Sequence, residues 1–389
     1  MENFSGNSNL DSSVTGNGAP ASTTESLIRA LTASLDRVTL GGLYLSNPVN
    51  IRYLTGFTGS YARLLVPTSK DSDPILFTDG RYRDQATTQL REYGAERVRI
   101  DPKGSLDELP ERLSSLVTTL SQPTLGVEER SITWSELEMV RQAVGAKIEI
   151  KSASHSVEEL RKRKKPEEIA QLRRAATIGD LALAAVIEQL PQGHSERTIA
   201  RLLDNTMLDL GADAPSFETI VASGPRAAMP HARPSDRTIT RGDLVVIDFG
   251  ATVNGYHSDC TRTFAIGTPN ESHAAVLKAV VEAQRLGVSL LAPTISCATI
   301  DRSVREALNE NGLGSYFTHG LGHGIGLEIH EAPWLHGRSG DVLEPSMVVT
   351  IEPGVYLPGD CGVRIEDSLV VTETGYEVLT KAPKDWIID

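Results

Sequence analysis

The sequence predicts an α+β protein built from two domains. At roughly 150 residues per domain, the 389 residues suggest two domains, with one large domain as the alternative. Strand-like and helical runs alternate over residues 24–157, which is typical of an α/β domain. Over residues 158–389 strands and helices are interspersed without regular βαβ repetition, and this favours a largely antiparallel sheet.

Composition and charge argue against several classes of function. The formal net charge of −13 repels phosphate and anionic lipid, so we expect no nucleic-acid partner and no membrane partner. No run approaches the roughly 18 apolar residues of a spanning helix, and the N-terminus lacks the pattern of a secretory signal. Cys260, Cys297 and Cys361 form neither a disulfide framework nor a Cys-x-x-Cys zinc pattern. We therefore expect a soluble, reduced, cytoplasmic protein.

The first part of the chain predicts a leader followed by the smaller domain. Residues 1–23 are rich in Ser, Gly, Asn and Thr, and they are predicted to be flexible because they bury too little apolar surface to offset the entropy of ordering. Residues 75–77 and 147–150 predict strands. Residues 107–120 predict a helix with Asp107 as its N-cap.

The domain boundary is predicted near a helix that starts at Pro166, with acidic residues in its first turn. The five basic residues 161–165 before it are predicted to form a solvated charged face. Further helices are predicted over residues 195–210, 273–290 and 300–308, and strands over residues 219–222, 244–249, 347–352 and 363–371.

Asn254-Gly255 predicts the first of two hairpins that carry carboxylates, because Asn-Gly suits a type I′ turn. A two-residue turn there pairs Asp248 with Thr261 and makes Asp259 the diagonal neighbour of Asp248 on one face. Two such carboxylates are close enough to share ions, and on an apolar strand pair they are destabilising without a cation. The alternative is an edge hairpin with two solvent-facing Asp.

Three histidines and four glycines stand together in residues 319–331. The histidines are His319, His323 and His330, and the glycines allow the backbone to approach a ligand closely. The alternative is a glycine-rich loop with incidental surface histidines.

The second hairpin is predicted around Gly359. A loop of odd length centred there places Glu352 and Glu366 directly opposite each other. Arg364 shares their face and can brace a carboxylate bidentately. The alternative is a surface pair between Glu366 and Arg364.

Together the two hairpins present four carboxylates, with the histidine segment between them in the sequence. Four carboxylates and one neutral imidazole are balanced by two divalent cations. A ligand set of oxygen and nitrogen without thiolate favours Mn²⁺, Co²⁺ or Zn²⁺. Two such ions form a hydrolytic centre that activates water and polarises a carbonyl.

These motifs resemble the pita-bread metallopeptidases, the superfamily of methionine aminopeptidase, aminopeptidase P, prolidase and creatinase. Residues 47–57 and 79–82 resemble the creatinase-like N-terminal domain, and residues 158–389 resemble the pita-bread catalytic domain. The resemblance implies that the metal ligands are Asp248, Asp259, His323, Glu352 and Glu366.

The same resemblance implies roles for the neighbouring residues. His231 and His330 match the two histidines that face the substrate, and Arg364 matches an arginine that holds a ligand carboxylate. Glu352 matches the carboxylate that passes a proton from water towards the leaving proline nitrogen.

Within the superfamily the chain resembles the Xaa-Pro peptidases, which act on proline-containing peptides and commonly form homodimers. The predicted function is Xaa-Pro aminopeptidase (aminopeptidase P), with Xaa-Pro dipeptidase (prolidase) as the alternative. In several prolidases that resemble this chain, an Arg four residues beyond the second substrate histidine binds the free carboxylate, whereas Trp334 stands there in this chain. A third alternative is a catalytically silent binding scaffold, against which the complete ligand set argues.

Overall fold

The computed structural model describes residues 21–69, 71–101, 106–384 and 387–388. The chain divides into two compact units, Met1–Val157 and Glu158–Asp389. Residues 1–20 of the predicted leader lie outside the described residues, and residues 21–23 belong to the first helix, α1 (Ala21–Arg37). Regular structure therefore begins before residue 24, where the first domain was predicted to start.

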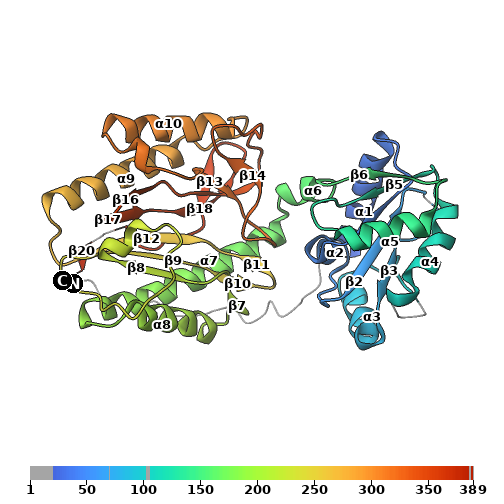
Figure 1. Cartoon of the computed structure of the whole chain (residues 1–389), viewed down its shortest axis with the longest axis horizontal. Helices are drawn as coiled ribbons and strands as arrows, with labels where there is room; N and C mark the ends of the chain where they lie inside the picture. The colour runs from blue at the N-terminus through green and yellow to red at the C-terminus, as the bar shows by residue number, and fades with distance from the viewer. Residues whose placement is uncertain (1–20, 70, 102–105, 385–386, 389) are drawn as a thin grey trace. The chain divides into compact units, whose positions relative to one another are not determined.

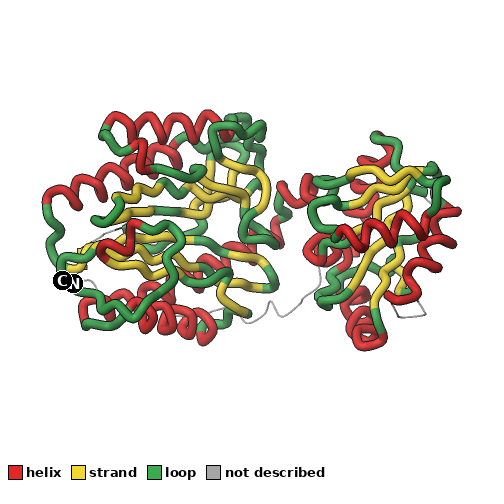
Figure 2. Tube along the Cα trace, viewed as in Figure 1, coloured by secondary structure: helices red, strands yellow, loops and turns green. Residues whose placement is uncertain are grey.

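The first unit is an α/β domain built on one mixed six-stranded sheet (Figure 2). The strands are β1 (Gly42–Leu45), β2 (Ala62–Pro67), β3 (Ile75–Thr78), β4 (Arg99–Ile100), β5 (Thr124–Val127) and β6 (Glu149–Ser152), in the order β4-β3-β2-β1-β5-β6. The other helices are α2 (Pro48–Thr55), α3 (Arg83–Glu92), α4 (Leu109–Leu116) and α5 (Trp134–Val144). Phe77 of the sheet packs with Leu113 of α4 and Val140 of α5 in the core of this unit.

The predicted strands and helix of this unit are present, but the predicted N-cap of the helix is wrong. The strand over residues 75–77 is confirmed, and the strand predicted over residues 147–150 begins two residues later. The helix predicted over residues 107–120 is α4 between two 3₁₀ turns. Asp107 is not its N-cap, because it lies inside the first 3₁₀ turn.

The second unit places small, mainly antiparallel sheets between two pairs of helices (Figure 1). After the short α6 (Glu158–Lys162), the helices are α7 (Pro166–Val186) and α8 (Glu196–Asp209) on one side, and α9 (Glu271–Ser289) and α10 (Cys297–Glu310) on the other. One apolar cluster packs α7 and α8 against the first hairpin, and a second packs α9 and α10 against the other sheet. α7 starts at the predicted Pro166, and α8, α9 and α10 confirm the other predicted helices with ends that differ by one to three residues.

The sheets of this unit are ordered β20-β12-β9-β8, β14-β13-β15-β18-β19, β11-β10-β7 and β16-β17. The strands of the first and third are β7 (Ala214–Pro215), β8 (Ile220–Ser223), β9 (Leu244–Phe249), β10 (Ala251–Val253), β11 (Tyr256–His257), β12 (Cys260–Ile266) and β20 (Ile387–Ile388). The others are β13 (Gly322–Gly324), β14 (Glu331–Leu335), β15 (Val348–Ile351), β16 (Gly354–Leu357), β17 (Cys361–Arg364), β18 (Asp367–Val371) and β19 (Tyr376–Val378).

Both hairpins have the predicted register. Asp248 pairs with Thr261 around the Asn254-Gly255 turn, where both residues adopt positive φ (48° and 74°). In the second hairpin Gly354 pairs with Arg364 and Ile351 with Asp367, which places Glu352 opposite Glu366.

The strand predicted over residues 363–371 is broken in two. β17 ends at Arg364 and β18 begins at Asp367. Between them Glu366 donates its backbone N–H to the carbonyl of Thr261 at 3.0 Å. This bond ties the second hairpin to the first.

The prediction of a solvated face for residues 161–165 is wrong for two of its members. Arg161 and Lys164 are each only 3 % exposed. Both bind the buried carboxylate of Glu331, and Arg161 also pairs with Glu328 at 2.8 Å. Their partners stand about 170 residues away in the sequence, so the local charge run held no sign of burial.

Among the described residues, no helix has the length and apolar character needed to cross a bilayer.

Candidate metal centre

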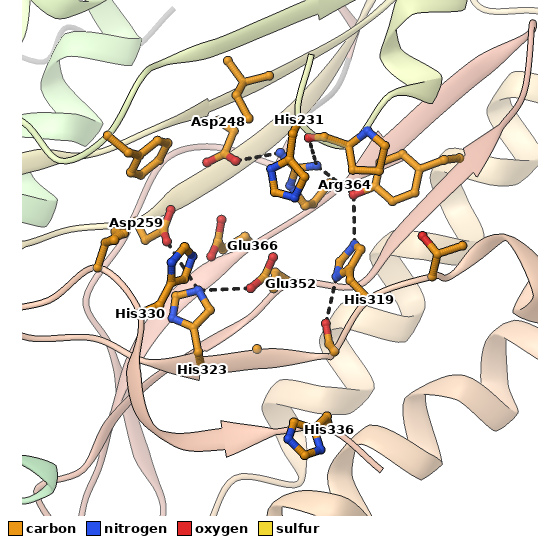
Figure 3. Close-up of a pocket in the computed structure, with 18 of the residues that line it drawn as sticks. His231, Asp248, Asp259, His319, His323, His330, His336, Glu352, Arg364 and Glu366 are labelled. Carbon is orange, nitrogen blue, oxygen red and sulfur yellow. Dashed lines mark hydrogen bonds and ion pairs between the residues drawn. The ribbon is translucent and has the colours of Figure 1, made fainter. Parts of the chain in front are cut away.

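One cavity of about 1010 Å³ in the second unit collects the predicted site residues (Figure 3). Its lining includes His231, Asp248, Asp259, His323, His330, Glu352, Arg364 and Glu366. The hairpin registers bring the four carboxylates together: Asp248 lies on β9, Asp259 directly before β12, and Glu352 and Glu366 beside the second hairpin. Figure 3 shows these four carboxylates facing one another across the cavity.

Burial and mutual repulsion disfavour negative charge on two of the four carboxylates. Burial raises the pKa of Asp259 well above its usual value, and the charges of Glu366 and Asp248 raise it further. Burial raises the pKa of Glu366 in the same way, with Glu352 and Asp248 adding to the effect. Four carboxylates that line one cavity therefore need positive charge among them.

His323 faces these carboxylates with one defined nitrogen. Its Nδ1 lies 3.0 Å from the carbonyl oxygen of Gly324, so Nδ1 carries hydrogen and donates it. Its Nε2 lies 3.2 Å from Oε1 of Glu352 and 3.7 Å from Oδ2 of Asp259. Burial lowers the pKa of His323, but the hydrogen bond and charge of Glu352, the carbonyl of Gly324 and the charge of Asp248 together outweigh burial, and the pKa is raised. The lone pair on Nε2 and the carboxylate oxygens repel each other. A proton or a metal cation between Nε2 and these oxygens removes the repulsion.

Each of three carboxylates is also held from behind by a hydroxyl or a guanidinium. Thr261 donates to Oε2 of Glu366 at 2.7 Å, and Thr350 donates to Oε1 of Glu352 at 3.3 Å. Arg364 donates to Oδ2 of Asp248 at 2.6 Å. Arg364 therefore holds a carboxylate of the other hairpin, through one hydrogen bond rather than the predicted two.

The unsatisfied oxygens of the cluster fit a metal centre. Oδ1 of Asp248 and Oε1 of Glu366 are buried and have no hydrogen-bond partner in the part of the chain that the structure describes. Asp259, His323 and Glu366 each offer one ligand atom, and these atoms lie within 4.8 Å of one another. Buried carboxylate oxygens without donors are stabilised by cations. Five oxygen and nitrogen side chains without thiolate suit Mn²⁺, Co²⁺ or Zn²⁺.

The two predicted substrate histidines lie on the cavity wall. The ring of His330 packs edge-on against that of His323, with centroids 4.4 Å apart. Burial, followed by the charge of His323, lowers the pKa of His330, so its imidazole is neutral at neutral pH. His231 lies on the other side of the cluster, near Asp248 and Arg364 (Figure 3).

Two further residues belong to the site, and the sequence had suggested no role for either. Nε2 of His319 lies 3.0 Å from the hydroxyl of Tyr356, which accepts a hydrogen bond from Arg364 at 2.7 Å. Tyr356 stands four residues after Glu352 on the same hairpin face, so strand alternation was a usable signal for it. His319 was visible as the first histidine of the glycine-rich segment.

Two family models match the chain. Residues 170–373 match the family model described as metallopeptidase family M24, and residues 28–163 match the creatinase/prolidase N-terminal domain. The chain belongs to metallopeptidase family M24. The predicted fold, a creatinase-like domain followed by a pita-bread domain, is thereby confirmed, and this M24 member is a metal-dependent Xaa-Pro peptidase.

The relatives of this M24 member align over nearly their whole length. The Xaa-Pro dipeptidase of Pyrococcus furiosus is 37% identical over 364 residues, which cover 92% of this chain and 98% of that protein. The structure of the Xaa-Pro dipeptidase from Bacillus anthracis has a TM-score of 0.87 at 38% identity and covers 94% of this chain and 100% of its own. The structure of the X-Pro aminopeptidase from Thermotoga maritima has a TM-score of 0.82 at 33% identity. That match covers 94% of this chain and 99% of the other chain. Most of the named relatives are dipeptidases, which favours the predicted alternative over aminopeptidase P.

Proposed function

We propose that this chain is an Xaa-Pro dipeptidase, with a free cation in its cavity that receives the carboxylate of the substrate. The observation that carries the proposal is the state of Arg338. This residue lines the cavity, and its guanidinium has no hydrogen bond or ion pair with any residue that the structure describes. The proposal therefore replaces aminopeptidase P, the function first predicted, with its alternative.

The other arginines that line the cavity already form ion pairs with carboxylates of this chain. Arg305 binds Asp301 and two backbone carbonyls, and Arg364 binds Asp248. Arg233 pairs with Glu218 at 3.1 Å. A dipeptide ends in a carboxylate directly after proline, and a carboxylate removed from water needs a cation. Arg338 can supply that cation although Trp334 occupies the position where the resemblance to several prolidases predicts Arg.

The residues of the cluster support a hydrolytic mechanism. Two divalent ions, when bound by Asp248, Asp259, His323, Glu352 and Glu366, supply an activated water and polarise the scissile carbonyl. Glu352 accepts the proton of the attacking water and passes it to the proline nitrogen as the C–N bond breaks. His330 and His231 donate hydrogen bonds to the carbonyl oxygen as it becomes negative. The products are a free amino acid and proline.

The identity of the metal, the oligomeric state and the cellular location remain predictions. The metal is Mn²⁺, Co²⁺ or Zn²⁺, since all three accept these ligands. A homodimer and a cytoplasmic location follow from the family resemblance and the composition. Sedimentation of the purified full chain tests the homodimer.

Aminopeptidase P remains the second candidate because of Trp334. This side chain lines the cavity and is 39 % exposed. Its apolar ring suits a peptide that continues beyond proline better than a terminal charge. A cavity of about 1010 Å³ is at the upper end for a small-molecule site and also has room for a longer peptide.

The test compares Ala-Pro, Ala-Pro-amide and Ala-Pro-Ala under one metal condition. We expect kcat/KM for Ala-Pro to exceed that for the other two by about tenfold, and Arg338→Gln to remove this advantage, because a charged hydrogen bond is worth roughly 1.5–3 kcal/mol. Arg233→Gln is the matched control, since Arg233 lines the same cavity but pairs with Glu218. A preference for Ala-Pro-Ala that survives Arg338→Gln overturns the proposal and favours aminopeptidase P.

A further inference from the structure

A second group of metal-binding side chains lies outside the catalytic cavity. His273 stands in the first turn of α9, and Asp360 and Cys361 stand where the second hairpin turns into β17. α9 packs against both strands of this hairpin (Figure 1). None of the three residues lines the catalytic cavity, and the proposed mechanism uses none of them.

The three donor atoms are already close together. One imidazole nitrogen, one carboxylate oxygen and the Cys361 sulfur lie within 4.8 Å of one another. Nε2 of His273 is 3.0 Å from Oδ1 of Asp360. With metal–ligand bonds of about 2.0–2.3 Å, tetrahedral donors stand about 3.3–3.8 Å apart, so small side-chain rotations suffice to bind one ion.

Two polar atoms of this group are buried without partners. Nδ1 of His273 is inaccessible and has no hydrogen-bond partner among the described residues. Cys361 is fully buried, and its thiol makes no hydrogen bond within the described part of the chain. Burial raises the pKa of this thiol to about 12, so without a metal it stays protonated. The group therefore joins a buried thiol without a hydrogen-bond partner and an imidazole with one unpartnered nitrogen to a carboxylate that is half exposed.

We propose that His273, Asp360 and Cys361 bind one thiophilic divalent cation of the zinc class, with water as the fourth ligand. Binding replaces the S–H bond of Cys361 with a sulfur–metal bond and releases one proton. Thiolate selects Zn²⁺ over Mn²⁺, so this site and the oxygen-rich catalytic centre differ in metal preference. The ion joins α9 to the hairpin that carries Tyr356 and Arg364 at the catalytic site.

The probe is Cd²⁺, added to the full-length protein after its catalytic centre has been loaded with Mn²⁺. Thiolate bound to Cd²⁺ absorbs in the ultraviolet, and the five proposed catalytic ligands include no thiolate. We expect a thiolate-to-cadmium band that saturates at one equivalent, with release of one proton. The band disappears in Cys361→Ser, and in His273→Ala the affinity for Cd²⁺ falls by tenfold or more. Cys297→Ser is the control, because Cys297 is equally buried but belongs to no such cluster.

Three outcomes overturn the proposal: no band, a band that does not saturate at one equivalent, or an unchanged band in Cys361→Ser. If Cys361→Ser does not fold, His273→Ala decides, because alanine fits the first turn of α9. Hydrolysis of Ala-Pro by His273→Ala loaded with Mn²⁺ is expected to stay within threefold of the parent. Failure of this metal site is therefore distinguishable from failure of the proposed dipeptidase activity.

Discussion

Arg364 on the second hairpin donates a 2.6 Å hydrogen bond to Asp248 on the first. The two residues are 116 positions apart in the sequence, and this bond fixes the orientation of a proposed metal ligand across the cavity. Arg364→Lys keeps the charge but loses the planar donor geometry. We expect its affinity for Mn²⁺ to fall by about 10–100-fold, as measured by metal titration of the apoprotein. Unchanged affinity would show that Asp248 needs no such support.

Chelation is expected to abolish the hydrolysis of Xaa-Pro bonds, and Mn²⁺ or Co²⁺ is expected to restore it. The reason is the buried, donor-poor carboxylate cluster around His323. The measurement is activity on Ala-Pro together with metal content by mass spectrometry. Full activity in apoprotein verified to be metal-free would contradict the mechanism.

His330→Ala is expected to keep its metal and to lose roughly 10²-fold in kcat/KM, the size of a lost hydrogen-bond donor to the developing negative charge. Its ring contacts His323 but lies on the cavity wall. Asp259→Asn is the comparison, and it is expected to lose metal as well as activity. Metal analysis and steady-state kinetics of both variants separate the two roles. If His330→Ala loses its metal, then ligand and substrate roles have been exchanged.

Lys164→Met is expected to lower the free energy of unfolding by about 3–5 kcal/mol, because it leaves a buried carboxylate short of one cation. The Lys164 side chain is 1% exposed, and its Nζ lies 2.7 Å from Oε1 of Glu331. Arg163→Met is the matched control: its side chain is 59% exposed and pairs with Glu344 on the surface, so it should change stability by less than about 1 kcal/mol. Urea unfolding of both variants measures the difference. An equal loss of unfolding free energy in both variants would mean that the buried pair contributes no more to stability than the surface pair.

Glu196 makes stability depend on pH through the segment that carries His231. It is fully buried and accepts hydrogen bonds from Ser223, Arg226 and Ser235. Burial raises its pKa, but the hydrogen bonds from Ser235 and Ser223 outweigh burial and lower it. A carboxyl with a lowered pKa stabilises the fold fully above its usual pKa of about 4.3, and this contribution is lost as pH falls through the lower folded value.

Glu196→Gln should therefore be less stable than the parent at pH 7 by about 3 kcal/mol, and the gap should narrow below about pH 4. Urea unfolding at both pH values measures it, with the exposed Glu188→Gln as the control. A gap that is independent of pH would show that the charge of Glu196 is not what stabilises the segment.

The local sequence was enough to predict both hairpins and the carboxylates on them. Asn254-Gly255 favours one turn type, and alternation along each strand then places Asp248 and Asp259, or Glu352 and Glu366, on one face. The helix starting at Pro166 was equally predictable, because its signals lie within one turn of chain.

Only the tertiary structure decided which side chains meet across the hairpins and which charges are buried. The sequence predicted that Arg364 braces a carboxylate but not which one, and the packing of the two hairpins gives it Asp248. Arg161 and Lys164 resembled a solvated charge run because their partner Glu331 lies about 170 residues further on. The sequence could not distinguish Arg338 from the other arginines either. Whether an arginine lacks a carboxylate partner depends on which side chains surround it in the folded chain. Turns and strand faces depend on neighbours a few residues apart, whereas burial and ion pairing depend on contacts that exist only after the chain has folded.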